Sequence, residues 1–153
     1  MTAAIYRLAL RTWQAPGWRA AVFRMVNETH DVFPYERAIF FDLTTTVPRL
    51  IAISGQEEPP RDTPYAAAGC KIAAQARRRG IGMLRAAEFA DLAPEWTAVC
   101  PAGCALWLPL KVEGENVAAL WLEKAGGAEY SEEEIALLGV LAEGYAATLA
   151  RYH

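Results

Sequence analysis

Residues 104–124 read CALWLPLKVEGENVAALWLEK, and this stretch decides the fold. Leucines alternate with other residues on both sides of the polar turn EGEN. Because successive side chains of a strand point to opposite faces, this period of two predicts a β-hairpin. One face carries Trp107 and Trp121. The other face consists of leucines, namely Leu106, Leu108, Leu110, Leu120 and Leu122. Since both faces are apolar, we expect the hairpin to lie at the centre of a sheet.

A long helix is expected after the hairpin, over residues 131–152. Ser131 precedes Glu134 by three residues, which is the spacing of a capping box, where each side chain binds a free amide of the first turn. From Ile135 onward, apolar residues recur at steps of three and four and cover a wide stripe. Such a helix needs a sheet on one side and other helices on the other.

The N-terminal part of the chain predicts helices followed by a first hairpin. Apolar residues at helical spacing fall within residues 1–33 and are interrupted at Ala15-Pro16-Gly17. Runs of Ile, Phe, Leu and Val follow at residues 38–44 and 50–54, which is typical of strands.

The middle of the chain predicts an inserted helix over residues 63–79 and then a lid. Thr63-Pro64 is a favourable helix start, and the arginines at positions 77–79 should lie in the last turn, where their charge complements the helix dipole. The alternative is that these arginines form a patch that binds a partner. A strand is expected near residues 83–87. Residues 88–103 should form an irregular segment over the sheet.

Together these elements predict one α+β domain over residues 1–153. The N- and C-terminal helices would cover one face of an antiparallel sheet within residues 38–124, and the inserted helix and the lid would cover the other. A length of 153 residues with 54% hydrophobic content suits a single core of this kind.

Composition excludes several classes of protein. The net charge of -3 and the lack of a concentrated basic stripe argue against nucleic-acid binding. No apolar run approaches the roughly 20 residues that a membrane-spanning helix needs, and the N-terminus lacks the features of a signal peptide. The three cysteines are too few for a secreted disulfide framework. We therefore expect a cytoplasmic protein without membrane insertion.

No catalytic or metal-binding pattern stands out. The two histidines, His30 and His153, lie far in sequence from Cys70, Cys100 and Cys104, and the spacing matches no zinc site. Neither histidine is placed to activate a thiol. We predict structural cysteines, no catalytic residue, no metal and no cofactor.

Short matches along the chain resemble one known family. They are Met25–Thr29, Val32–Tyr35, Ala52–Gly55, Trp107–Leu110 and Leu141–Tyr145. Together these stretches resemble the GAF region associated with HlyD-type membrane-fusion adaptors and efflux transporters. The resemblance implies a GAF-like (PAS-like) α+β fold, a sensory or regulatory role without catalysis, and a link to an export system.

The resemblance also bears on particular ligands and activities. Glu123-Lys124 stands where cyclic-nucleotide-binding GAF domains carry Asn-Lys, and no cysteine is followed by a histidine as in bilin-binding domains. Neither ligand is therefore expected. Methionine sulfoxide reductases of this fold use three cysteines, so a thiol-dependent reductase is kept as an alternative.

Aromatic residues provide the candidate ligand site. If the leucine face packs on the terminal helices, the other face presents aromatic rings that could bind a small planar or apolar molecule. The candidate residues are Phe41, with Phe40 as its alternative, Tyr65, Trp96, Trp107 and Trp121. The alternative is that these rings only fill the core.

The terminal helices provide a candidate interaction surface. Because their apolar residues exceed what one partner can cover, we expect a homodimer through these helices. A second possibility is a module without a ligand that docks through its helices on a transporter or a signalling protein.

Overall fold

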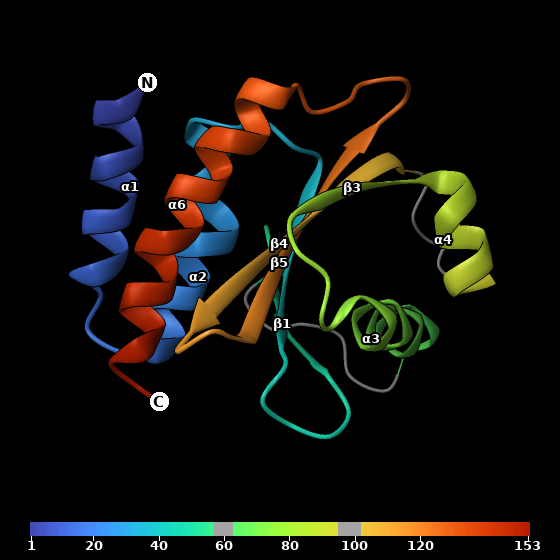
Figure 1. Ribbon diagram of the computed structural model, residues 1–153, viewed down its shortest axis with the longest axis horizontal. Coiled ribbons are helices and arrows are strands. Elements are labelled where there is room, and N and C mark those ends of the chain that lie inside the picture. The colour runs from blue at the N-terminus through green and yellow to red at the C-terminus, as the bar shows by residue number, and fades with distance from the viewer. Residues whose placement is uncertain (57–62, 95–101) are drawn as a thin grey trace.

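A computed structural model describes residues 1–56, 63–94 and 102–153 of the chain. The sheet lies in the middle, with α1, α2 and α6 on one side and α3 and α4 on the other (Figure 1). The elements in chain order are α1 (Thr2–Trp13), α2 (Trp18–Glu28), η1 (Thr29–Asp31), β1 (Arg37–Asp42), β2 (Arg49–Ile53), α3 (Pro64–Ala76), β3 (Gly82–Arg85), α4 (Ala86–Leu92), β4 (Ala102–Val112), β5 (Glu115–Ala125) and α6 (Glu132–Ala150). The predicted α+β architecture is confirmed.

The strands form an antiparallel sheet in the order β2-β1-β5-β4-β3. β4 and β5 pair along their length and place Trp107 opposite Trp121. Only Glu113 and Gly114 form the connecting turn, and their φ angles of 54° and 82° are both positive, as a type I′ turn requires. Glu115 and Asn116, which we predicted in the turn, belong to β5.

The two faces of the central hairpin separate as predicted. The leucines of one face are fully buried in a core formed with α1, α2 and α6. Trp107 and Trp121 lie in a second core, formed between the sheet and α3. Each sheet face therefore has its own helical cover (Figure 1).

Helix α6 begins with the predicted capping box. Glu134 N donates to Ser131 Oγ over 3.1 Å, and Ser131 N donates to Glu134 Oε1 over 3.0 Å. The helix then runs between the sheet and α1. A Cβ at Gly144 would lie 2.7 Å from Ala9 Cβ, so α1 and α6 approach more closely than a larger residue at this position would permit.

Two predictions for the middle of the chain are wrong in part. Helix α3 ends at Ala76, so the arginines at 77–79 follow the helix instead of forming its last turn. Helix α4 occupies residues 86–92, where we expected the end of a strand at residues 86–87 and an irregular segment from residue 88. The amide of Arg85 donates to Glu88 Oε2 over 2.8 Å, which stabilises the start of this short helix. Residues 102–103, also predicted to be irregular, belong to β4, and residues 95–101 lie outside the described residues.

Within residues 1–56, 63–94 and 102–153, no helix has both the length and the apolar character needed to cross a membrane.

Candidate functional site

Three of the five predicted ligand-binding residues lie side by side on the α3 side of the sheet. Phe41, Trp107 and Trp121 come from β1, β4 and β5, and we call these three rings the aromatic wall. The ring centroids of Phe41 and Trp107 are 6.3 Å apart, as are those of Trp107 and Trp121. These spacings allow favourable contacts between neighbouring rings.

The aromatic wall is buried under helix α3. Phe41 and Trp107 are each 1% exposed, and Trp121 is 0% exposed. Thr63 caps α3 by accepting a hydrogen bond from Ala66 N, and the helix then presents mainly small residues to this core, including Ala68, Ala73 and Ala76. The described residues thus place the wall in a core and not on an open surface.

The two remaining predicted site residues stay untested. Tyr65 belongs to α3, but its side chain is not among those described, and Trp96 lies outside the described residues.

The two indole N–H groups of the wall have different surroundings. Trp121 Nε1 donates to Glu123 Oε1 over 3.0 Å. Trp107 Nε1 is buried and has no hydrogen-bond partner in the described part of the chain. A buried donor without an acceptor costs about 1–3 kcal/mol. An acceptor atom placed next to this N–H group would remove that cost.

An ion pair that the sequence analysis missed adjoins the wall. Glu123 is 1% exposed, and its Oε2 accepts hydrogen bonds from Arg37 Nη2 over 2.8 Å and from Arg37 Nε over 3.1 Å. Glu123 follows Trp121 by two residues on β5 and so shares its face. The signal in the sequence is a glutamate that falls on the same face of an apolar strand as the residue two positions before it. Such a glutamate could have revealed this pair.

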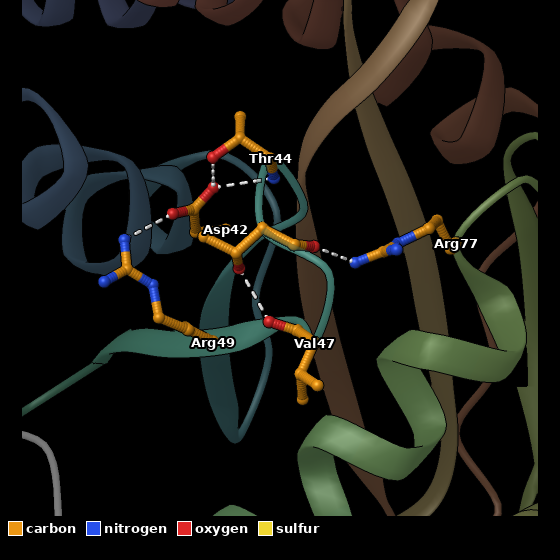
Figure 2. A network of polar contacts seen from close by, with 6 residues as sticks. Asp42, Thr44, Val47, Arg49 and Arg77 are labelled. Carbon is orange, nitrogen blue, oxygen red and sulfur yellow. Dashed lines mark hydrogen bonds and ion pairs between the residues drawn. The ribbon is translucent and has the colours of Figure 1, made fainter.

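A second polar network holds the turn between β1 and β2 (Figure 2). Asp42 Oδ1 accepts hydrogen bonds from Thr44 N over 2.9 Å and from Thr44 Oγ1 over 2.6 Å, and Asp42 Oδ2 accepts one from Arg49 over 2.7 Å. Burial opposes ionisation of Asp42, but the hydrogen bonds from Arg49 and Thr44 outweigh it, and the pKa of this carboxyl lies below its usual value. Asp42 is therefore ionised at neutral pH.

Arg77 joins the same turn from α3. Its guanidinium donates to the backbone oxygens of Thr45 and Thr46, and Figure 2 shows it reaching toward this turn. Asn116 Nδ2 in turn donates to the backbone oxygen of Arg77 over 2.9 Å. Arg77 thus ties α3 to the β1–β2 turn, which corrects the prediction that it only complements the helix dipole.

The two described cysteines are free and differ in burial. Cys104 is buried, its thiol donates to the backbone oxygen of Ala128 over 3.1 Å, and burial raises its pKa. Cys70 is half-buried on α3, and Cys100 lies outside the described residues. Among the described residues, no group of three or more His, Cys, Asp or Glu side chains is placed to hold a metal ion.

Solved structures share this fold. The GAF domain of a phosphoenolpyruvate-protein phosphotransferase from Acinetobacter is similar to this chain with a TM-score of 0.74 and 16% identity, over 99% of this chain and 93% of that one. The corresponding domain from Coxiella burnetii gives a TM-score of 0.72 and 17% identity, over 98% and 92% of the two chains. A phycoerythrobilin-bound GAF domain from a cyanobacterial phytochrome gives 0.71 and 12%, over 99% and 95%.

This chain therefore has the GAF fold, as the sequence resemblance implied. No protein-family model matches the sequence, and no curated protein matches it significantly.

Proposed function

We propose that this chain is a sensory or regulatory domain that binds a small molecule at the aromatic wall and catalyses no reaction. The observation that carries this proposal is the buried N–H group of Trp107, which has no acceptor among the described residues. Structures with the same fold come from a sensor histidine kinase and a methyl-accepting chemotaxis protein, and one GAF domain holds phycoerythrobilin. These neighbours support a sensory role.

The aromatic wall indicates the kind of ligand. Three neighbouring rings favour a planar or apolar molecule, and Trp107 Nε1 favours one that carries a hydrogen-bond acceptor. The described residues of α3 that cover the wall are largely alanines. Moving this helix away from the sheet would therefore expose less apolar area than moving a leucine-rich helix would. We infer that the ligand occupies space between α3 and the sheet.

The lack of catalysis is part of the proposal. Burial raises the pKa of Cys104, so the thiolate that a thiol-dependent reductase needs is disfavoured at this position.

Native mass spectrometry of the purified protein, combined with a matched pair of variants, tests the proposal. We expect a bound mass in the wild-type chain. Trp107→Phe keeps a ring but removes the N–H group, so it should reduce ligand retention while leaving the fold stable. Trp121→Phe removes a donor to buried Glu123, so it should lower stability. Unchanged retention in Trp107→Phe, or no bound mass in the wild type, would contradict the proposal.

A second candidate function is a module that docks through its helices. Large apolar side chains are exposed on the helical layer, among them Tyr6 at 68%, Phe23 at 49% and Val140 at 55%. Such residues suit contact with a second copy or with a transporter or signalling protein. The link to an export system and the cytoplasmic location rest on the sequence alone.

A further inference from the structure

A cavity of about 290 Å³ lies on the face of the sheet opposite the aromatic wall. It is bounded by Trp18 at the start of α2, by Phe40 and Asp42 on β1, and by Leu149 and Tyr152 at the end of α6. The volume is at the small end of the range for ligand pockets. The proposed function makes no use of this cavity.

Aromatic rings from three elements line the cavity. Trp18 and Phe40 pack edge to face, with centroids 6.3 Å apart and planes at 90°. Tyr152 is 40% exposed, and the guanidinium of Arg151 already lies over its ring, 5.7 Å from the centroid. The faces of such rings attract organic cations.

Asp42 supplies negative charge to the cavity. The residue is 8% exposed and, as its lowered pKa shows, ionised at neutral pH. A carboxylate offers about four acceptor positions. Thr44 uses two of them on Oδ1 and Arg49 uses one on Oδ2, as Figure 2 shows, which leaves one position on Oδ2.

The positive charge of Arg49 does not cancel the negative charge that Asp42 supplies to the cavity. The Arg49 side chain is 61% exposed, whereas that of Asp42 is 11% exposed, so water screens the guanidinium more strongly than the carboxylate. Asp42 is the only acidic side chain among the described residues that line the cavity.

The two helix ends at the cavity favour ligands of opposite charge. The C-terminal end of α6 carries the negative end of a helix dipole and favours a cation. The N-terminus of α2 has no side-chain cap and favours an anion. These partial charges largely offset each other, and the full charge of the buried carboxylate decides in favour of a cation.

We propose that this cavity binds a small organic ammonium ion. The cationic group lies against the rings of Trp18 and Tyr152, close to the Asp42 carboxylate. The free acceptor position on Oδ2 binds an N–H or O–H group of the ligand.

Isothermal titration of the full chain with choline tests this proposal. The controls are 3,3-dimethylbutan-1-ol, which is the uncharged isostere of choline, and sodium acetate. We expect choline to bind at least tenfold more tightly than the isostere and acetate not to bind. Equal affinity for choline and its isostere, or no choline binding, would overturn the proposal.

Variants separate a binding role of Asp42 from a structural one. Asp42→Asn should weaken choline binding at least tenfold. Arg49→Gln should strengthen it, because the variant removes the guanidinium that competes for Oδ2. The matched control is Glu132→Gln, an exposed position in the first turn of α6, which should leave binding unchanged. Two outcomes would count against the site: a lower choline affinity in Arg49→Gln, or an unchanged choline affinity in a folded Asp42→Asn. If Asp42→Asn does not fold, the choline affinity of Arg49→Gln decides alone.

Discussion

At the scale of single residues, hydrogen bonding distinguishes side chains that look alike in the sequence. Trp107 and Trp121 are paired across β4 and β5 and are equally buried. Within the described part of the chain, only the indole of Trp121 has an acceptor, because Glu123 follows two positions later on the same face. The proposed ligand contact therefore involves the N–H group of Trp107 and not that of Trp121.

Asp42 should make the stability of the protein sensitive to acid. Its pKa is lower in the folded chain than the ordinary value of 3.8, so its ionised form stabilises the fold above that pH, and this contribution is lost as the pH falls through the folded pKa. We expect the unfolding free energy to fall more steeply below about pH 4 in the wild type than in Asp42→Asn. Urea denaturation between pH 3 and pH 6 measures this slope, and parallel slopes would contradict the assignment.

The cysteines should be dispensable. Replacing Cys70, Cys100 and Cys104 together by alanine should preserve the fold and ligand retention, with a packing loss of roughly 1 kcal/mol per buried site. The check is thiol titration and reductase assay with and without peroxide. Reducing turnover that is present in the wild type and lost in the triple variant would restore the reductase alternative.

At the scale of elements, the close contact between α1 and α6 depends on Gly144. Alanine normally stabilises a helix relative to glycine by about 1 kcal/mol. At Gly144, however, the added Cβ would lie 2.7 Å from Ala9 Cβ. We therefore expect Gly144→Ala to destabilise the protein by about 1–3 kcal/mol through overpacking.

Gly139 provides the matched control on the same helix. A Cβ there would meet only the end of the Ile81 side chain, at 3.2 Å, and that flexible group can move. Gly139→Ala should be neutral or stabilising in thermal unfolding. Equal losses for both variants would show that the α1–α6 contact is not the cause.

Helix α6 also shows how far local pattern determines an element. Its start follows from the Ser131–Glu134 spacing, and its apolar character follows from residues 135–150. By contrast, the sequence did not predict α4. Its seven residues, with one acidic residue in the first turn, are too few to show a recognisable helical repeat of apolar residues.

At the scale of the whole molecule, the helical layer remains partly uncovered. Exposed apolar residues on α1 and α6 include Tyr6, Trp13 and Val140. Arg151 lies 4.4 Å from the Trp13 ring centroid and links the end of α6 to α1, which brings part of this surface together. Such a surface suits a second copy of the chain.

We expect the purified protein to be a homodimer in light scattering. Val140→Glu places a charge in the exposed apolar surface and should shift the mass toward the monomer. Val47→Glu is a control at another exposed apolar residue, in the β1–β2 turn, and should leave the mass unchanged. A monomeric mass for the wild type over a wide concentration range would contradict the expectation.

The sequence by itself determined most of the local elements, with α4 and the end of α3 as exceptions, and it determined the two sides of the central hairpin. Strand alternation, helix caps and turn residues depend on neighbours within a few positions, so they can be read along the chain. The grouping of Trp107 with Trp121 also followed, because a short hairpin fixes which residues face each other.

Only the tertiary structure decided which distant residues meet. Arg37 pairs with Glu123 across 86 positions, and Arg77 reaches the β1–β2 turn more than 30 positions away. These contacts depend on the order of strands in the sheet and on where α3 lies across it, which no local period encodes. The arrangement of strands and helices also places Asp42 between the start of α2 and the end of α6. There a buried carboxylate and aromatic rings from three separate elements form one cavity.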